Sequence, residues 1–131
     1  METLGNLGDL NDCGIQGRTV AQVRVIFIPN YLDPGAPRVP LAYVQPFKLA
    51  PGTKGRTDPE LNMYRLRREL RSDNSRKGVI VPLSQIWRPI ELIPVFGSRC
   101  NAEWTCDTAV EESLEFFLNS FPDKATYIMV Y

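Results

Sequence analysis

The side chains best suited to chemistry in this 131-residue chain form a basic run between positions 65 and 77. The run reads RLRRELRSDNSRK, and its basic residues are Arg65, Arg67, Arg68, Arg71, Arg76 and Lys77. Alternating arginines on an exposed hairpin can lie along nucleic-acid phosphates. The same pattern is typical of a solvated hairpin whose charges prevent unwanted strand pairing. The chain has 15 basic and 15 acidic residues, and this overall neutrality favours the second interpretation.

Few residues suit catalysis. The chain has no histidine, which removes the commonest general base and the commonest metal ligand. A cysteine nucleophile needs a nearby base, and no pair of cysteines has C-x-x-C spacing. The acidic cluster Glu111, Glu112 and Glu115 is explained by a solvated helix face. We therefore predict that the chain is not an enzyme and carries no metal or cofactor.

The tryptophans are candidates for a different chemistry, the anchoring of a protein partner. Trp104 lies in a polar segment, where anchoring and a structural role are equally compatible with the pattern. Trp87 lies inside an apolar stretch, which favours core packing over partner binding.

The elements that must position these residues are mostly strands. Residues 18–28 predict a strand with a phase slip near Gln22 that a β-bulge would explain. Residues 41–49 predict a second strand. Residues 61–70 predict a third strand that pairs with 79–83 through a turn at 71–77. The alternative for this segment is a helix, because Asp58-Pro59-Glu60 resembles a helix start.

Residues 78–97, GVIVPLSQIWRPIELIPVFG, form the most apolar and β-rich window. Its prolines exclude one long strand, so we expect two short strands with a corner over 83–89, central in the sheet. Gly97 permits an exit turn with positive φ.

The C-terminal part predicts one helix and one strand. Residues 108–121 predict a helix capped by Thr105 or Asp107, because their apolar residues recur at helical spacing. That apolar face consists of Val110, Leu114, Phe117, Leu118 and Phe121. Residues 125–131 alternate as a final strand.

Charge is unevenly distributed along the chain. Residues 48–77 carry an excess of five positive charges, and residues 101–131 an excess of five negative charges. We expect the two segments to face each other, within the fold or in an oligomer.

The remaining signals concern domain and compartment. Residues 1–16 are polar and predict a flexible segment, which leaves 17–131 as a single domain. The N-terminus lacks signal-peptide features, and no later segment is long and apolar enough to span a membrane. An odd number of cysteines without metal spacing favours free thiols in a reducing compartment, nuclear or cytoplasmic. The cysteines are Cys13, Cys100 and Cys106.

Three short segments resemble the BAH (bromo-adjacent homology) domain, a chromatin interaction module. Val44-Gln45-Pro46-Phe47 is similar to the family's V-x-W-F strand, the VPLSQI of 81–86 to its V-P-L-x-S-I, and the EFFL of 115–118 to its F-F-C segment. A closer resemblance is to an uncharacterised region of fungal proteins associated with KDZ-type transposable elements, through 23–27, 41–47 and 90–97. Together these similarities extend over 18–131.

The BAH resemblance implies a small barrel and a chromatin partner. Pro46 stands where methyl-lysine-reading members have a cage tryptophan, so a cation–π pocket would need other aromatic walls. The residues that can supply them are Tyr31, Tyr43, Phe47 and Trp87.

We therefore predict a mainly β fold, a small strongly bent (SH3/BAH-like) barrel of five to six strands with one C-terminal helix. The expected function is a non-catalytic interaction module for a protein or chromatin partner, with an expected origin in a mobile element. Its expected partner-binding residues are Tyr31, Tyr43, Phe47 and Trp104. The alternative is a nucleic-acid-binding accessory domain of a transposon-related protein that uses the 65–77 hairpin. No membrane partner is expected.

Overall fold

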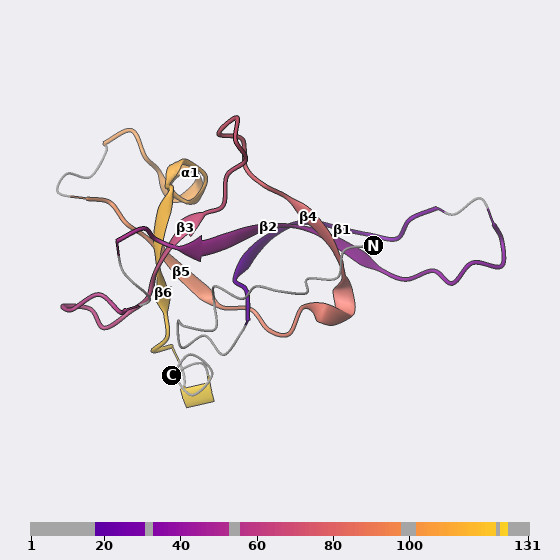
Figure 1. Ribbon diagram of the computed structural model, residues 1–131, viewed down its shortest axis with the longest axis horizontal. Coiled ribbons are helices and arrows are strands. Elements are labelled where there is room, and N and C mark those ends of the chain that lie inside the picture. Colours follow the sequence, from indigo (N-terminus) through magenta and orange to yellow (C-terminus); the bar gives the residue numbers. More distant parts are fainter. Residues whose placement is uncertain (1–17, 31–32, 53–55, 98–101, 123, 126–131) are drawn as a thin grey trace.

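The computed structural model describes residues 18–30, 33–52, 56–97, 102–122 and 124–125. Its strands form one antiparallel six-stranded sheet in the order β1-β2-β3-β6-β5, with β4 beside β2 (Figure 1). The strands are β1 (Ala21–Phe27), β2 (Leu41–Leu49), β3 (Arg65–Arg68), β4 (Val79–Pro82), β5 (Glu91–Pro94) and β6 (Glu115–Asn119). The helices are a 3-10 turn η1 (Leu83–Gln85) and an α-helix α1 (Cys106–Glu112). The predicted mainly β class is confirmed, but among the described residues β5 does not pair with β1, so the sheet is open.

β2 organises the sheet because it is paired along both edges. β1 runs along one edge, from Ala21 opposite Pro46 to Phe27 opposite Leu41. The register shifts between Val23 and Val25, which places the predicted β-bulge at Arg24. On the other edge, β4 pairs with the first half of β2 and β3 with its end. β3 and β4 therefore follow one another along one edge of β2.

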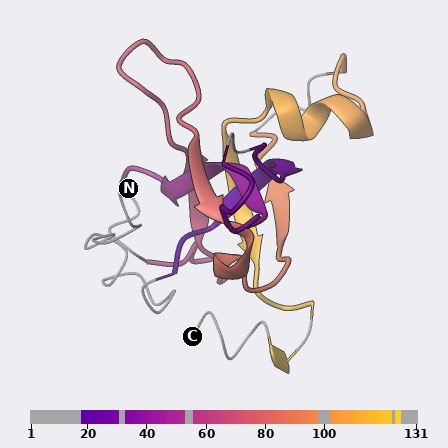
Figure 2. The same ribbon diagram turned by 90° about the vertical axis from the view of Figure 1, so that its right-hand side faces the viewer.

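Between β3 and β4 the chain leaves the sheet as a small hairpin, residues 69–77. Leu70 pairs with Arg76, and the Lys77 amide donates to the Glu69 carbonyl at 3.0 Å. The predicted strand within 61–70 is confirmed, but its predicted pairing with 79–83 is wrong. The hairpin closes on itself, so both flanking strands pair with β2 instead. Figures 1 and 2 show this hairpin and α1 at the same end of the molecule.

The apolar window 78–97 has the predicted two strands and corner, but its predicted central position is wrong. It supplies β4 and β5, each of which has one partner strand among the described residues. Pro82 and Pro94 lack the amide hydrogen that a second partner would need, which suits them to edge strands. Gly97 has the expected positive φ, at 70°.

The predicted helix over 108–121 is wrong beyond residue 112. α1 is capped by Thr105, whose side chain accepts from the Thr108 amide, and it ends at Glu112. β6 then lies between β3 and β5, with Phe116 and Leu118 each 1% exposed. Most of the predicted apolar helix face is exposed: Val110 41%, Leu114 48% and Phe121 48%. Burial in a central strand outweighs the helical spacing of this segment.

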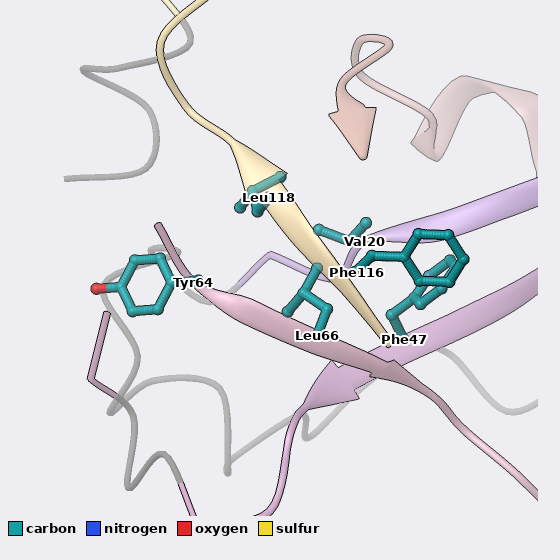
Figure 3. Close-up of a cluster of buried hydrophobic side chains, with 6 residues drawn as sticks. All are labelled: Val20, Phe47, Tyr64, Leu66, Phe116 and Leu118. Atoms are coloured by element: carbon teal, nitrogen blue, oxygen red, sulfur yellow. The ribbon is translucent and has the colours of Figure 1, made fainter. Parts of the chain in front are cut away.

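The main core lies where β2, β3 and β6 meet the residue before β1 (Figure 3). The Phe47 and Phe116 rings meet edge to face, with centroids 5.4 Å apart. Tyr64 lies at the margin of this cluster, with its hydroxyl directed away from the other side chains. The cluster consists of Val20, Phe47, Tyr64, Leu66, Phe116 and Leu118. A second cluster, Ala42, Val44 and Val81, covers one face of the β1-β2-β4 part of the sheet.

Several predictions fall outside the described residues. These are the flexible segment 1–16, most of the strand 125–131, Tyr31, Cys13 and Cys100. No helix among the residues the structure describes has the length and apolar character to cross a membrane.

Candidate interaction surfaces

Three apolar side chains lie side by side across β1, β2 and β4. Tyr43 of β2 is directly opposite Val25 of β1 and Ile80 of β4. Directly opposite residues point to the same face of a sheet, so these three side chains form one row. Val25 is 53% exposed, Ile80 is 59% exposed, and Tyr43 is half-buried. We call Val25, Tyr43 and Ile80 the apolar row.

The Tyr43 ring is held in place by Gly78, the residue before β4. A Cβ atom at position 78 would overlap the Tyr43 ring and hydroxyl, so the ring lies directly against the glycine. An aromatic ring covering a strand glycine compensates for the missing side chain. The ring thus lies over the glycine, in contact with the neighbouring strand.

The apolar row is unusual because of the face it occupies. The opposite face of the same three strands carries the buried cluster Ala42, Val44 and Val81. An antiparallel sheet with one packed face normally exposes polar residues on the other. Here Leu41, flanked by Phe27 and Pro82, continues the outward face with further half-buried apolar groups. A contiguous apolar surface of this kind is a candidate interaction site.

The other expected partner-binding aromatics have different environments. Phe47 is 3% exposed and belongs to the main core, so its ring is not available to a partner. Trp104 is half-buried and packs against Phe96, with ring centroids 6.0 Å apart. Tyr31 lies outside the described residues, and of the other three only Tyr43 lies on the exposed apolar face.

The prediction that Trp87 packs in the core is wrong. Its side chain is 61% exposed, and the Arg18 guanidinium lies 3.6 Å from the ring centroid. Trp87 follows η1 in a stretch before Pro89 that belongs to none of the described strands. The apolar residues around Trp87 suggested that it is buried in the core. Pro82 and Pro89, which interrupt strand pairing on either side of it, were the sequence feature that indicated otherwise.

Arg68 is a structural residue. It is 2% exposed, and its guanidinium donates to the Val110 carbonyl at 2.6 Å, the Ser113 carbonyl at 3.3 Å and the Gln22 side-chain oxygen at 2.7 Å. Desolvation, followed by the nearby positive charge of Arg76, lowers the pKa of Arg68 to about 10, so it stays charged at neutral pH. Its bonds join α1 to the sheet, which makes it unavailable to a nucleic acid.

Arg76 and Lys77 are also engaged within the fold. Arg76 and Arg24 both bind the Glu111 carboxylate, at 2.8 and 2.6 Å, and Lys77 binds Glu69 at 2.8 Å. The hydrogen bonds from Arg76 and then Arg24 lower the pKa of Glu111 to about 2. The Arg76 contact and a 2.6 Å pair between Arg65 and Glu115 confirm that the basic and acidic segments face each other within the fold.

Arg65 and Arg67 share the outward face of β3. Arg67 lies opposite Lys48 on one side and Glu115 on the other. The Arg65 guanidinium is 5.8 Å from the centre of the Phe117 ring. Within the described part of the chain, Arg67 and Arg71 form no ion pair. The basic run is therefore divided between an outward face, a buried position and the 69–77 hairpin.

The remaining features that bear on catalysis are acidic groups, a cysteine and a surface hollow. The described residues contain no group of three potential metal-ligating side chains. Cys106 is exposed at the start of α1. An open hollow of about 380 Å³ beside β3 contains Asp58, whose carboxylate accepts the Glu60 and Leu61 amides of its own turn. The hollow is lined by Gly52, Arg56, Thr57, Asp58, Pro59 and Arg65.

No known family model, curated protein or solved structure matches the chain. Evidence about function therefore comes from the surfaces of the structure, above all from the apolar row.

Proposed function

We propose that the chain is a non-catalytic interaction module whose apolar row binds a partner protein. The observation that carries the proposal is the alignment of Val25, Tyr43 and Ile80 across three paired strands, with both aliphatic side chains more than half exposed. Leaving this much contiguous apolar surface in water is unfavourable for an isolated protein, and a partner removes the cost.

The chemistry of the row suits a binding hot spot. Tyrosine is enriched at such positions because its ring contributes large contact area and its hydroxyl finds a hydrogen bond. Gly78 and the paired strands hold the ring in place, which lowers the entropy cost of binding. From the resemblance to BAH domains we further propose that the partner belongs to chromatin, that the complete fold is a bent barrel and that the protein acts in the nucleus.

The test is binding of the chain to immobilised histone-tail peptides. Tyr43→Ala and Ile80→Lys should each weaken binding about 30-fold, which corresponds to a hot-spot loss of about 2 kcal/mol. Ile93→Lys is the matched control, because Ile93 is an exposed aliphatic residue on the distant edge strand β5 and is 38% exposed. Unchanged binding by both row variants, or no histone peptide bound by the wild type, would contradict the proposal in this form.

A second candidate function is nucleic-acid binding by the outward face of β3. Lys48, Arg67 and Arg65 are neighbours there, and Phe117 offers a ring beside them, a combination that suits phosphate contacts and base stacking. This is the accessory role expected of a transposon-related protein.

A salt series with labelled duplex DNA and single-stranded RNA separates this candidate from the first. Arg67→Glu should weaken binding and reduce the salt slope by about one. Arg38→Glu, at an exposed arginine of the β1–β2 loop, is the charge-matched control. Arg68 is unsuitable for this test because it is buried. Absence of binding at low salt would eliminate the candidate.

A further inference from the structure

We infer that the outer edge of β1 receives an extended segment of the partner protein as an additional strand. This inference rests on the proposed function and names the geometry of binding. The edge is continuous with the apolar row, because Val25 belongs to both.

The middle and second half of β1 carry exposed apolar side chains. β1 pairs with β2 alone among the described strands. Val23, Val25 and Ile26 are 42%, 53% and 58% exposed, and Ile28, just after the strand, is 59% exposed. Successive side chains of a strand point to opposite faces, so neither face of this edge is covered. Since no described strand pairs with this edge, an added strand could bond to it with apolar side chains above and below.

From Val25 onward, β1 lacks the features that normally protect an edge. Protected edges carry proline, projecting charge or a bulge, and they are often short. β4 contains Pro82, and β5 contains Glu91 and Pro94, each in only four residues. β1 has seven residues and no proline. Its bulge lies at Arg24, and from Val25 to Ile28 the chain has four consecutive apolar residues.

Charge indicates which occupant fits this edge. Residues 18–30 contain Arg18 and Arg24 and no acidic residue. Glu111 is shared by Arg24 and Arg76, and Arg68 lies close enough to interact electrostatically with both arginines. A second copy of this chain would bring another basic strand to a basic edge. A partner segment that alternates apolar and acidic residues is complementary to both the apolar side chains and the positive charge of this edge. We therefore assign the edge to such a segment.

The experiment uses the full chain and a synthetic peptide, Thr-Val-Glu-Val-Thr-Val-Glu. Its matched probe has lysine at both glutamate positions. We expect the acidic peptide to bind, to slow hydrogen exchange at β1 amides, and to bind at least about tenfold more tightly than the lysine peptide. Ile26→Lys should abolish binding and Ile93→Lys should leave it unchanged. If Ile26→Lys alters exchange at β2 and β3 amides, Ile28→Lys replaces it.

The outcomes separate this inference from the proposed function. No binding of the acidic peptide, or equal binding by Ile26→Lys, Ile28→Lys and the wild type, overturns the edge inference. If Ile80→Lys still impairs histone-peptide binding in that case, the proposed function stands without it. Ile26 suits this separation because it points away from the face of the apolar row. Concentration-dependent dimers of the peptide-free chain with protected β1 amides would overturn the assignment in favour of a second copy.

Discussion

Replacement of Arg68 by alanine is expected to lower the free energy of unfolding by about 3 kcal/mol. The truncation leaves the buried Ser113 carbonyl, the Val110 carbonyl and the Gln22 side-chain oxygen without this donor. It also removes the guanidinium that lies 5.2 Å from the centres of both the Phe47 and Phe116 rings. The loss is large because α1 is only seven residues long and needs such contacts to stay on the sheet.

Urea unfolding followed by circular dichroism measures the effect. Arg67→Ala is the matched control: it removes the same side chain one position away, on the outward face, and should change stability by less than about 0.5 kcal/mol. Arg68→Lys should fall between the two, because an ammonium keeps the charge but cannot replace the planar fork. Equal stability of Arg67→Ala and Arg68→Ala would show that Arg68 does not hold α1 to the sheet.

Replacement of Phe116 by alanine is expected to cost about 3–5 kcal/mol, through lost transfer free energy and the cavity left behind. Phe116 is 1% exposed and packs edge to face against Phe47 in the main core. Since β6 lies between β3 and β5, the cavity would open in the middle of the sheet.

Phe117→Ala is the decisive comparison, because Phe117 is half-buried on the outward face beside Arg65. It should cost roughly 1 kcal/mol, which gives a clear ranking of the two neighbouring phenylalanines. The helix that residue spacing predicts for 108–121 places Phe117 on the apolar face and reverses this ranking. Thermal or denaturant unfolding of both variants therefore tests the strand assignment directly.

Residues 115–119 match a helical pattern but form a strand, which shows a limit of residue spacing as a predictor of secondary structure. Val110, Leu114, Phe117, Leu118 and Phe121 match helical spacing, yet Phe116 and Leu118 match strand alternation equally well. Local propensity cannot choose between the two. The choice follows from two partners distant in the sequence, since β3 and β5 satisfy both edges of β6.

Strand alternation within the basic run already indicated that its arginines divide between two faces. In a strand, Arg68 shares a face with Leu66, and Arg65 shares the other with Arg67. The strand prediction for this segment therefore implied that the six basic residues could not form one surface. Which face was buried depended on β2 and β6, whose residues Phe47 and Phe116 cover the side of Leu66 and Arg68.

The sequence by itself determined the local features: the mainly β class, the bounds of β2, a bulge within β1, a helix start at Thr105 or Asp107 and the positive φ of Gly97. Each depends on a few neighbouring residues, so nearby side chains and backbone constraints are sufficient to specify it. Only the tertiary structure decided that the apolar window forms edge strands, that Trp87 is exposed, that Arg68 is buried, and that Val25, Tyr43 and Ile80 form one row. These features depend on strand order and register, which arise from contacts between segments far apart in the chain.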